Sequence, residues 1–527
     1  MKAKEIFTMS VRLALALFLL LILGNRSLAV TRAEFLNLLF TTGLNYKELK
    51  SPPLPRDVPR RHRFAGAIGS SLQYGLIPAA KEERKIFGPD ETINGREAVR
   101  LALIMMGWGF EVSLCESLGQ MGLYGTDDPI SSLACEMRPP APKRVIAKWT
   151  EPLSDAGKNS IMSWVRSCKK GVWWKKELVS RDTALLVYKR GIALPGVRGY
   201  RSEPFDGSSS NNPLYVVAVT ARPEQIDAEI TFAKALGRSV ARLSEISVKE
   251  NAVAAVNGGF FAGNLPVGTL LLDGVHAGRP FKDRPAVGWR KGGDALIFDD
   301  GSVRVGIRTK SGYVPITRFN SPPTADGASL YTSRVTKSAS GIASDAVLIA
   351  VRDGTATGCV RELARNGQFT VEGEIVVARG RSREMLSDLA PGAPLRIVSN
   401  WSAPVFAGQD YLIQAGPLLL NDGLPQNFSD NKGNYRKSFL KNRHPRTIAG
   451  TDGAKIFWAV IDGRDPIHSL GATMEEAKSI ALALGLKSAI NLDGGGSSQL
   501  IWMGMTVNKP SGGKERLLPY AVIMKTN

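Results

Sequence analysis

The chain has 527 residues, of which 43% are hydrophobic and 22% are charged. This composition is typical of a folded soluble protein, and the length excludes a single ordinary core, so two or three domains are expected. The formal net charge of +20 indicates anionic surroundings, either nucleic acid or an anionic polymer or phosphate-bearing substrate.

Residues 1–29 have the features of a secretory signal peptide. Basic residues precede an apolar run over 13–24, and residues 27–29 (Ser-Leu-Ala) supply a small-x-small cleavage pattern. The twelve-residue run is too short to span a bilayer comfortably. We therefore expect export with cleavage before Val30, rather than an uncleaved membrane anchor, and a secreted or envelope-associated protein. The leader carries four basic residues and one acidic residue, so the mature chain keeps a net charge of +17.

Residues 30–110 contain an internal repeat. The stretch "VTRAEFLNLLFTTGL" aligns with "INGREAVRLALIMMGW", which places Glu34 against Glu97. Each copy starts with a cap-like Thr or Asn and continues with apolar residues at helical spacing, so each predicts an amphipathic helix. With "DVP" and "FGPD" between the copies, the region resembles the S-layer homology module. This resemblance implies attachment to a cell-wall polymer; the alternative is a small helical domain without a ligand.

Residues 111–174 are interpreted as a linker or small extension, because "RPPAPKR" favours extended backbone. The chain has four cysteines and no C-x-x-C pair, so no metal or redox motif is indicated. In an exported protein Cys115 and Cys135 are candidates for a disulfide. Free thiols are the equal alternative.

Residues 175–527 predict a sheet-rich α+β domain. Short β-branched and aromatic runs alternate with Gly, Asp and Asn, as in "LYVVAVTA", "NAVAAVNGGFF", "DAVLIAV", "IFWAVIDG" and "SAINLDGG". Few helices interrupt these runs, which favours a mixed domain built on a large sheet.

One helix of this domain is well signalled. In "TMEEAKSIALALGLK", Thr473 and Glu476 form a capping-box pattern, and Gly485 is placed to end the helix. The helix connects two predicted strands, which therefore run parallel as neighbours in a crossover unit. Asp462 and Asp493 would then follow the carboxyl ends of adjacent strands, where open sheets place their ligand sites.

Glycine-rich strand ends and arginines complete the candidate site. Gly494, Gly495 and Ser497 offer backbone and hydroxyl donors to a phosphate or another oxyanion. A second strand end carries Asn257, Gly258 and Gly259. Arginine binds phosphate oxygens with two parallel donors, so Arg446 and Arg464 are candidate clamps.

Paired carboxylates beside phosphate-binding groups favour hydrolysis at a sugar carbon that bears a phosphate. Glycosidases use one carboxyl as acid or base and the other as nucleophile or water-activating base. We expect Asp493 and Asp462 to take these two roles. Phosphate leaves readily once its charge is neutralised, so cationic donors reduce the need for an acid to protonate the leaving oxygen.

Six segments carry a resemblance to a known family. In chain order they are "VNGGFF", "QAGPLLLNDG", "RHPRTIAGTDG", "AVIDGRDPIHSLGATMEEAKSIALALG", "INLDGGGSS" and "VNKPSGGKER". Together they resemble the phosphodiester glycosidase family over about residues 190–527. The resemblance implies cleavage of the bond between an anomeric carbon and a phosphodiester, in a pocket that also includes Thr447. We expect no cofactor and assign no metal-binding residues; the sequence leaves open whether a metal assists.

The sequence leaves two other functions open. The first is a non-catalytic envelope protein that binds an anionic cell-wall glycan. The Asp493→Asn variant of such a protein would still bind the glycan. The second is nucleic-acid binding through net charge. No nucleic-acid-binding motif accompanies the charge, and the leader indicates export, so nucleic acid is not the expected partner.

Overall fold

The computed structural model describes residues 30–43, 48–50, 52–73, 87–124, 127–147, 150–168, 172–180, 182–191, 213–237, 239–292, 295–360, 367–387, 389–431 and 433–527. The predicted signal peptide lies outside the described residues. The chain divides into two compact units. Unit 1 comprises Met1–Lys175, Lys189–Pro213 and Pro466–His468, and unit 2 comprises Lys176–Tyr188, Leu214–Asp465 and Ser469–Asn527.

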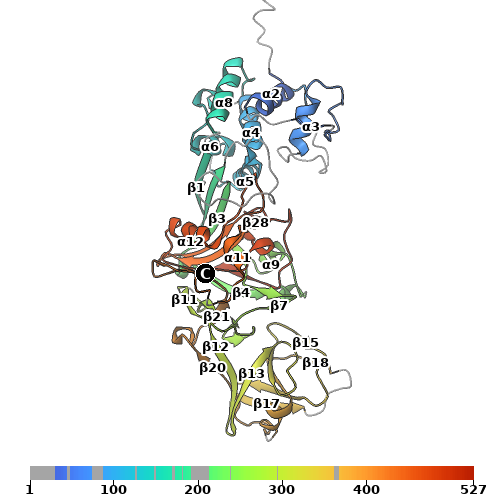
Figure 1. The fold of residues 1–527 in the computed structure, drawn as a ribbon, viewed down its shortest axis with the longest axis vertical. Coiled ribbons are helices and arrows are strands. Elements are labelled where there is room, and N and C mark those ends of the chain that lie inside the picture. Colours follow the sequence, from blue (N-terminus) through green and yellow to red (C-terminus); the bar gives the residue numbers. More distant parts are fainter. Residues whose placement is uncertain are drawn as a thin grey trace, which may run out of the picture. The chain divides into compact units, whose positions relative to one another are not determined.

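Unit 1 is built from helices (Figure 1). They are α2 (Arg32–Leu38), η1 (Leu39–Gly43), α3 (Ala65–Gln73), α4 (Gly95–Leu103), η2 (Ile104–Trp108), α5 (Gly109–Gln120), α6 (Pro129–Glu136), α7 (Lys143–Ile146) and α8 (Asp155–Cys168). Both helices of the repeat are confirmed. Thr31 with Glu34, and Asn94 with Glu97, form capping boxes that satisfy the first backbone N–H groups of α2 and α4. The S-layer homology resemblance stays a prediction.

Helices α4 to α5 form a continuous apolar stretch, Gly95–Gln120, that is long enough to cross a membrane. Its most apolar window is 72% buried among other residues. Such burial is typical of the core helix of a folded domain. Cys115, Cys135 and Cys168 are not disulfide-bonded, so the Cys115–Cys135 disulfide is not formed.

Glu111, Lys189 and His468 form a buried charged cluster in unit 1. Lys189 Nζ and His468 Nδ1 lie 3.1 and 3.0 Å from Glu111 Oε1, and Lys189 donates to the His468 carbonyl oxygen at 2.5 Å. Burial would raise the pKa of Glu111, but the interactions with Lys189 and His468 outweigh it and lower the pKa to about 2. The cluster holds together three segments that are far apart in the sequence.

We expect Glu111→Gln to lower the free energy of unfolding by about 3–5 kcal/mol, because Lys189 keeps a buried charge and loses its carboxylate. The pH dependence follows from the lowered pKa. The contribution of Glu111 is complete above its ordinary pKa of 4.5 and is lost as the pH falls towards about 2. Urea unfolding between roughly pH 2 and pH 7, which brackets this window, measures both effects.

The matched control is Glu116→Gln in the same helix. Glu116 pairs with Arg100 at 2.9 Å and is partly exposed, so its loss costs about 1 kcal/mol or less. If Glu111→Gln unfolded at the same urea concentration as Glu116→Gln, the buried cluster would not be a stabilising element.

Most of an eight-stranded sheet lies in unit 2, and the strand order is β1-β2-β3-β25-β24-β26-β22-β23. The strands are β1 (Val172–Ser180), β2 (Thr183–Gly191), β3 (Leu214–Ala221), β22 (Leu418–Asn421), β23 (Leu424–Pro425), β24 (Arg446–Thr451), β25 (Ile456–Ile461) and β26 (Ser488–Asn491). Helix α12 (Met474–Ala483) packs Ala477 and Ala481 onto Ile448 and Ala459 of this sheet. Its predicted capping box from Thr473 to Glu476 is confirmed.

A five-stranded sheet supplies the other side of the candidate site. Its order is β28-β27-β5-β29-β4, with β4 (Ile226–Phe232), β5 (Ala254–Asn257), β27 (Leu500–Trp502), β28 (Met505–Thr506) and β29 (Tyr520–Thr526). Helix α9 (Leu243–Lys249) covers it through Leu243 and Ile246, which pack against Ala255, Ile501 and Ile523. The predicted strands at "LYVVAVTA", "NAVAAVNGGFF", "DAVLIAV", "IFWAVIDG" and "SAINLDGG" are all present, and the α+β class is confirmed.

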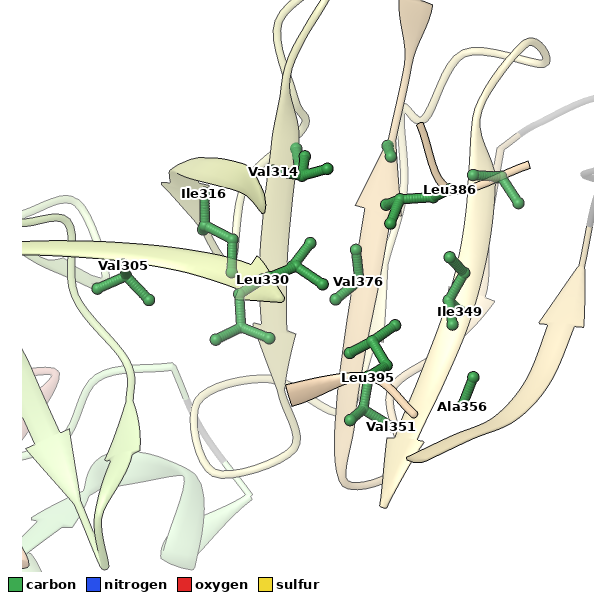
Figure 2. Packing of buried hydrophobic residues seen from close by; sticks show 14 of the residues in the cluster. Val305, Val314, Ile316, Leu330, Ile349, Val351, Ala356, Val376, Leu386 and Leu395 are labelled. Atoms are coloured by element: carbon green, nitrogen blue, oxygen red, sulfur yellow. The ribbon is translucent and has the colours of Figure 1, made fainter. Parts of the chain in front are cut away.

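A seven-stranded sheet between β11 and β21 in the sequence has its own core (Figure 1). Its order is β17-β16-β19-β14-β13-β12-β20, with β12 (Val303–Thr309), β13 (Gly312–Phe319), β14 (Ala328–Thr332), β16 (Val347–Arg352), β17 (Thr355–Val360), β19 (Glu374–Ala378) and β20 (Arg396–Trp401). Figure 2 shows Leu330, Ile349 and Val376 from three of these strands packed with Leu386 and Leu395. Successive residues of a strand point to opposite faces, so Leu330, Ile349 and Val376 share one face, while Tyr331, Leu348 and Val377 belong to a second hydrophobic cluster.

The remaining strands and short helices of unit 2 connect these sheets. A second five-stranded sheet has the order β11-β10-β21-β8-β9, and two pairs are β6-β7 and β15-β18. Their bounds are β6 (Phe261–Ala262), β7 (Leu265–Pro266), β8 (Leu270–Leu272), β9 (Val275–His276), β10 (Pro285–Trp289), β11 (Ile297–Asp300), β15 (Ser338–Ala339), β18 (Phe369–Thr370) and β21 (Tyr411–Gln414). The short helices are η3 (Pro223–Gln225), η4 (Ala233–Leu236), α10 (Gly380–Glu384), η5 (Pro404–Phe406), α11 (Lys437–Lys441) and η6 (Gly495–Ser497).

Candidate active site

Strand β24 lies between β25 and β26 and runs antiparallel to both. Arg446 pairs with Ile461 of β25, and Ile448 pairs with Asn491 of β26. The two crossover strands are therefore parallel, as predicted, but the prediction that they are neighbours is wrong. An antiparallel strand begins where its neighbours end. Arg446 and Thr447 are thus brought to the sheet edge at which Asp462 and Asp493 follow their strands.

A buried hydrogen-bond network joins this edge to β5 of the five-stranded sheet. Asn257 Oδ1 accepts from Thr447 Oγ1 at 2.8 Å and from the Gln499 backbone N–H at 3.2 Å. Asn257 Nδ2 donates to the Asp493 carbonyl oxygen at 2.9 Å. Asn257 and Thr447 are at most 1% exposed. They position the Asp493 loop rather than face solvent.

Asp493 is a partly exposed carboxyl held by donors from its own loop. The Gly494 backbone N–H donates to Asp493 Oδ1 at 2.9 Å, and Ser497 hydrogen-bonds the same side chain. Burial raises the pKa of Asp493, while these hydrogen bonds and the charge of Arg516 offset part of the rise. A raised pKa suits a carboxyl that donates a proton.

Arg464 lies against the glycine loop with its backbone in the left-handed region, at φ +64°. Its Nη2 is 2.9 Å from the position that a Cβ on Gly495 would take, and the left-handed backbone of Gly495, at φ +62°, favours glycine there. Arg464 Nη2 is also 3.3 Å from His444 Nδ1. Burial, and then the charges of Arg446 and Arg464, lower the pKa of His444 to about 4, so a neutral imidazole faces the guanidinium.

Arg516 contacts the same loop at Ser497. Its Nη1 donates to Ser497 Oγ at 3.0 Å, and its guanidinium carbon is 4.8 Å from the centre of the Phe261 ring. Residues Gly495–Ser497 are therefore flanked by two guanidinium groups, one from Arg464 and one from Arg516. This arrangement concentrates positive charge around a loop with little side-chain bulk.

Arg446 is buried, and its guanidinium already has partners. Nε donates to the Ala472 carbonyl oxygen at 2.8 Å, and Nη2 donates to the carbonyl oxygens of Phe439 and Asn442 at 2.8 and 2.9 Å. Burial, followed by the nearby charge of Arg464, lowers the pKa of Arg446 to about 10. The geometry favours Arg464 over Arg446 for direct contact with a substrate anion.

Asp462 is 1% exposed, unlike Asp493. Its Oδ1 accepts from Asn508 Nδ2 at 2.8 Å, and its Oδ2 accepts from the Lys509 backbone N–H at 2.7 Å. These bonds fix the segment after β28 to the end of β25. The geometry favours a positioning role for Asp462, and its predicted catalytic role stays a prediction.

Gly258 and Gly259 are required by the close approach of Tyr520 and Ile413, respectively. A Cβ on Gly258 would lie 2.3 Å from Tyr520 Cε2, and one on Gly259 would lie 2.6 Å from Ile413 Cγ2. Burial and then the charge of Asp493 raise the pKa of Tyr520, so its phenol stays neutral beside the carboxyl. These glycines serve packing under the site.

The structure thus brings together the predicted Asn257, Gly258, Gly259, Arg446, Thr447, Asp462, Arg464, Asp493, Gly494, Gly495 and Ser497 around one sheet edge. Sequence reasoning missed His444, Arg516 and Tyr520. Arg516 lies in "VNKPSGGKER", a segment quoted for the family resemblance, so its basic residues were an available signal. Tyr520 begins a strand as an ordinary core residue would, and nothing local marks it.

Comparison with known proteins gives one family. Residues 345–525 match the family model for phosphodiester glycosidase. This region is a phosphodiester glycosidase domain. The match covers β24, β25, β26 and the Asp493 loop, whereas Asn257 lies before it. It supports a hydrolase that acts on glycosidic bonds.

Two solved structures show more remote likenesses. A hypothetical protein from Synechocystis aligns at 20% identity with a TM-score of 0.51, over 68% of this chain and 78% of that one, and so shares the fold. The catalytic domain of zebrafish N-acetylglucosamine-1-phosphodiester alpha-N-acetylglucosaminidase aligns at 14% identity with a TM-score of 0.33, over 67% of this chain and 88% of that one. No curated protein matches the chain.

Proposed function

We propose that the protein is an exported glycosidase that hydrolyses the bond between a sugar anomeric carbon and a phosphodiester in envelope or extracellular glycans. The family match supports the glycosidase chemistry. The N-terminal leader supports export, and the net charge supports an anionic polymer rather than a neutral one. The S-layer-homology-like region supports attachment to a cell-wall polymer.

One observation carries the proposal. Asp493, with a raised pKa, lies in a loop whose glycines are flanked by Arg464 and Arg516. A carboxyl beside two guanidinium groups matches a sugar–phosphate linkage, in which the proton acceptor and the anion are adjacent. A neutral glycoside carries no anion for the two guanidinium groups to bind.

The roles follow from this geometry. Arg464 and Arg516 bind the phosphodiester oxygens and stabilise the charge that grows on them as the bond from the anomeric carbon to oxygen breaks. Asp493 donates its proton to the departing oxygen and then takes one from the attacking water. The products are a free sugar and a phosphomonoester. His444 stays neutral and orients Arg464.

The full-length protein tests the proposal with α-N-acetylglucosamine-1-phosphodiesters, such as the nucleotide sugar, and a small panel of other sugar-1-phosphodiesters. We expect release of free sugar from at least one diester and none from the methyl glycoside of the same sugar, which lacks the phosphate. Binding of the diesters without release would instead support a non-catalytic envelope protein.

A further inference from the structure

Unit 2 contains a polar cavity of about 610 Å³ away from the Asp493 loop. One wall comes from β4 and η4, and includes Phe232 and Lys234. Another comes from the β6–β7 hairpin through Asn264, and a third comes from β14 and the chain after it, with Tyr331 and Lys337. The volume is large enough to hold a sugar unit.

The cavity is positively charged. Lys234 and Lys337 both line it, and no acidic side chain does so among the described lining residues. Burial and then the charge of Lys337 lower the pKa of Lys234, so the two ammonium groups repel each other. The one described partner of Lys234 Nζ is the Ser333 carbonyl oxygen, which carries no charge to neutralise it. An anion in the cavity would relieve this repulsion.

The rest of the lining suits sugar hydroxyls. Four serine or threonine residues and two asparagines contribute polar groups. Tyr331 lines the cavity at 2% exposed, and its buried hydroxyl has no hydrogen-bond partner among the described residues.

The cavity is connected to the candidate active site through the chain and by packing. The β6–β7 hairpin follows Gly258, Gly259 and Phe260 directly. Phe232 stacks on Tyr520 with ring centres 5.3 Å apart, and Tyr520 in turn packs against Gly258. Tyr520 also senses the charge of Asp493, so one lining residue of the cavity packs directly on a neighbour of the candidate carboxyl.

We propose that this cavity is a second subsite, which binds the neighbouring phosphate-bearing sugar unit of a polymeric substrate. Lys234 and Lys337 bind the phosphate, and the serine, threonine and asparagine side chains bind sugar hydroxyls. The inference rests on the proposed function, because it takes the same phosphate-linked glycan as ligand. It makes the protein selective for chains over single diesters.

Calorimetric binding to full-length Asp493→Asn tests the subsite without turnover. The probes are a trimer of phosphodiester-linked N-acetylglucosamine, the corresponding single methyl phosphodiester, and inorganic phosphate. In the Lys234→Gln/Lys337→Gln background we expect the affinity for the trimer to fall about tenfold or more, and that for the single diester to stay unchanged. A Lys249→Gln/Lys310→Gln background, which removes two exposed lysines, controls for net charge.

The outcomes separate this inference from the proposed function. Equal trimer affinity in the two double-lysine backgrounds would overturn the subsite, even if the wild-type protein hydrolyses single diesters. Lysine-dependent trimer binding without any hydrolysis by wild type would keep the subsite and overturn the glycosidase. If phosphate binding were as lysine-dependent and as tight as trimer binding, the cavity would be a site for free phosphate and the glycan subsite would be wrong.

Discussion

Asp493→Asn is expected to lower kcat for a sugar-1-phosphodiester by about 10²–10⁴-fold, the range for loss of a positioned acid–base group. The asparagine keeps the shape and can still accept from the Gly494 N–H, so the loop keeps its conformation. It cannot donate a proton to the leaving oxygen. Release of free sugar under saturating substrate measures the effect.

The pH profile gives the same prediction a second readout. Burial raises the pKa of Asp493 above its ordinary value of 3.8. If Asp493 acts in its protonated form, the wild-type rate falls as the pH rises through this raised pKa. The control is Asp353→Asn, the same change at an exposed turn residue whose left-handed backbone asparagine tolerates. A variant at Asp493 with the rate and pH profile of that control would exclude a catalytic role.

Arg464→Gln is expected to lower kcat by about 10²–10³-fold, as loss of one charged donor to a developing anion does. The residue is only half-buried and its backbone is already left-handed, so the fold should change little. The substitution also removes one of the charges that lower the pKa of His444. We therefore expect the His444 imidazole, followed by NMR, to titrate at a higher pH than in wild type.

The matched control for Arg464 is Arg436→Gln, an exposed arginine of the basic segment before β24. It tests whether overall positive charge, rather than the charge beside Gly495, accounts for the rate. A similar loss in both variants would argue that the substrate is attracted by the whole surface. Unchanged titration of His444 in Arg464→Gln would contradict the contact between the two side chains.

Local patterns predicted much of the fold. The capping box at Thr473 and the period of apolar residues after it define α12 because helix starts depend on neighbours within four residues. The strand ends at Asn257 and Asp493 were visible for the same reason, as glycines follow the apolar runs directly.

Sheet order and burial were not visible in this way. β24 and β25 form a local hairpin, but the insertion of β24 beside β26 depends on pairing across helix α12, which leaves no local pattern. Arg446 and Arg464 are the same residue type in similar motifs. Only burial and the three backbone acceptors around Arg446 distinguish the two.

The cluster of Glu111, Lys189 and His468 bears on how such a chain can be recombined. A domain exchange with its junction at residue 175 would carry Lys189 and His468 into the product and leave Glu111 behind. The lysine would then be left in a core without its carboxylate, which is strongly destabilising. Among relatives with this arrangement, the three positions should therefore be inherited as a set, although 357 residues separate the first from the last.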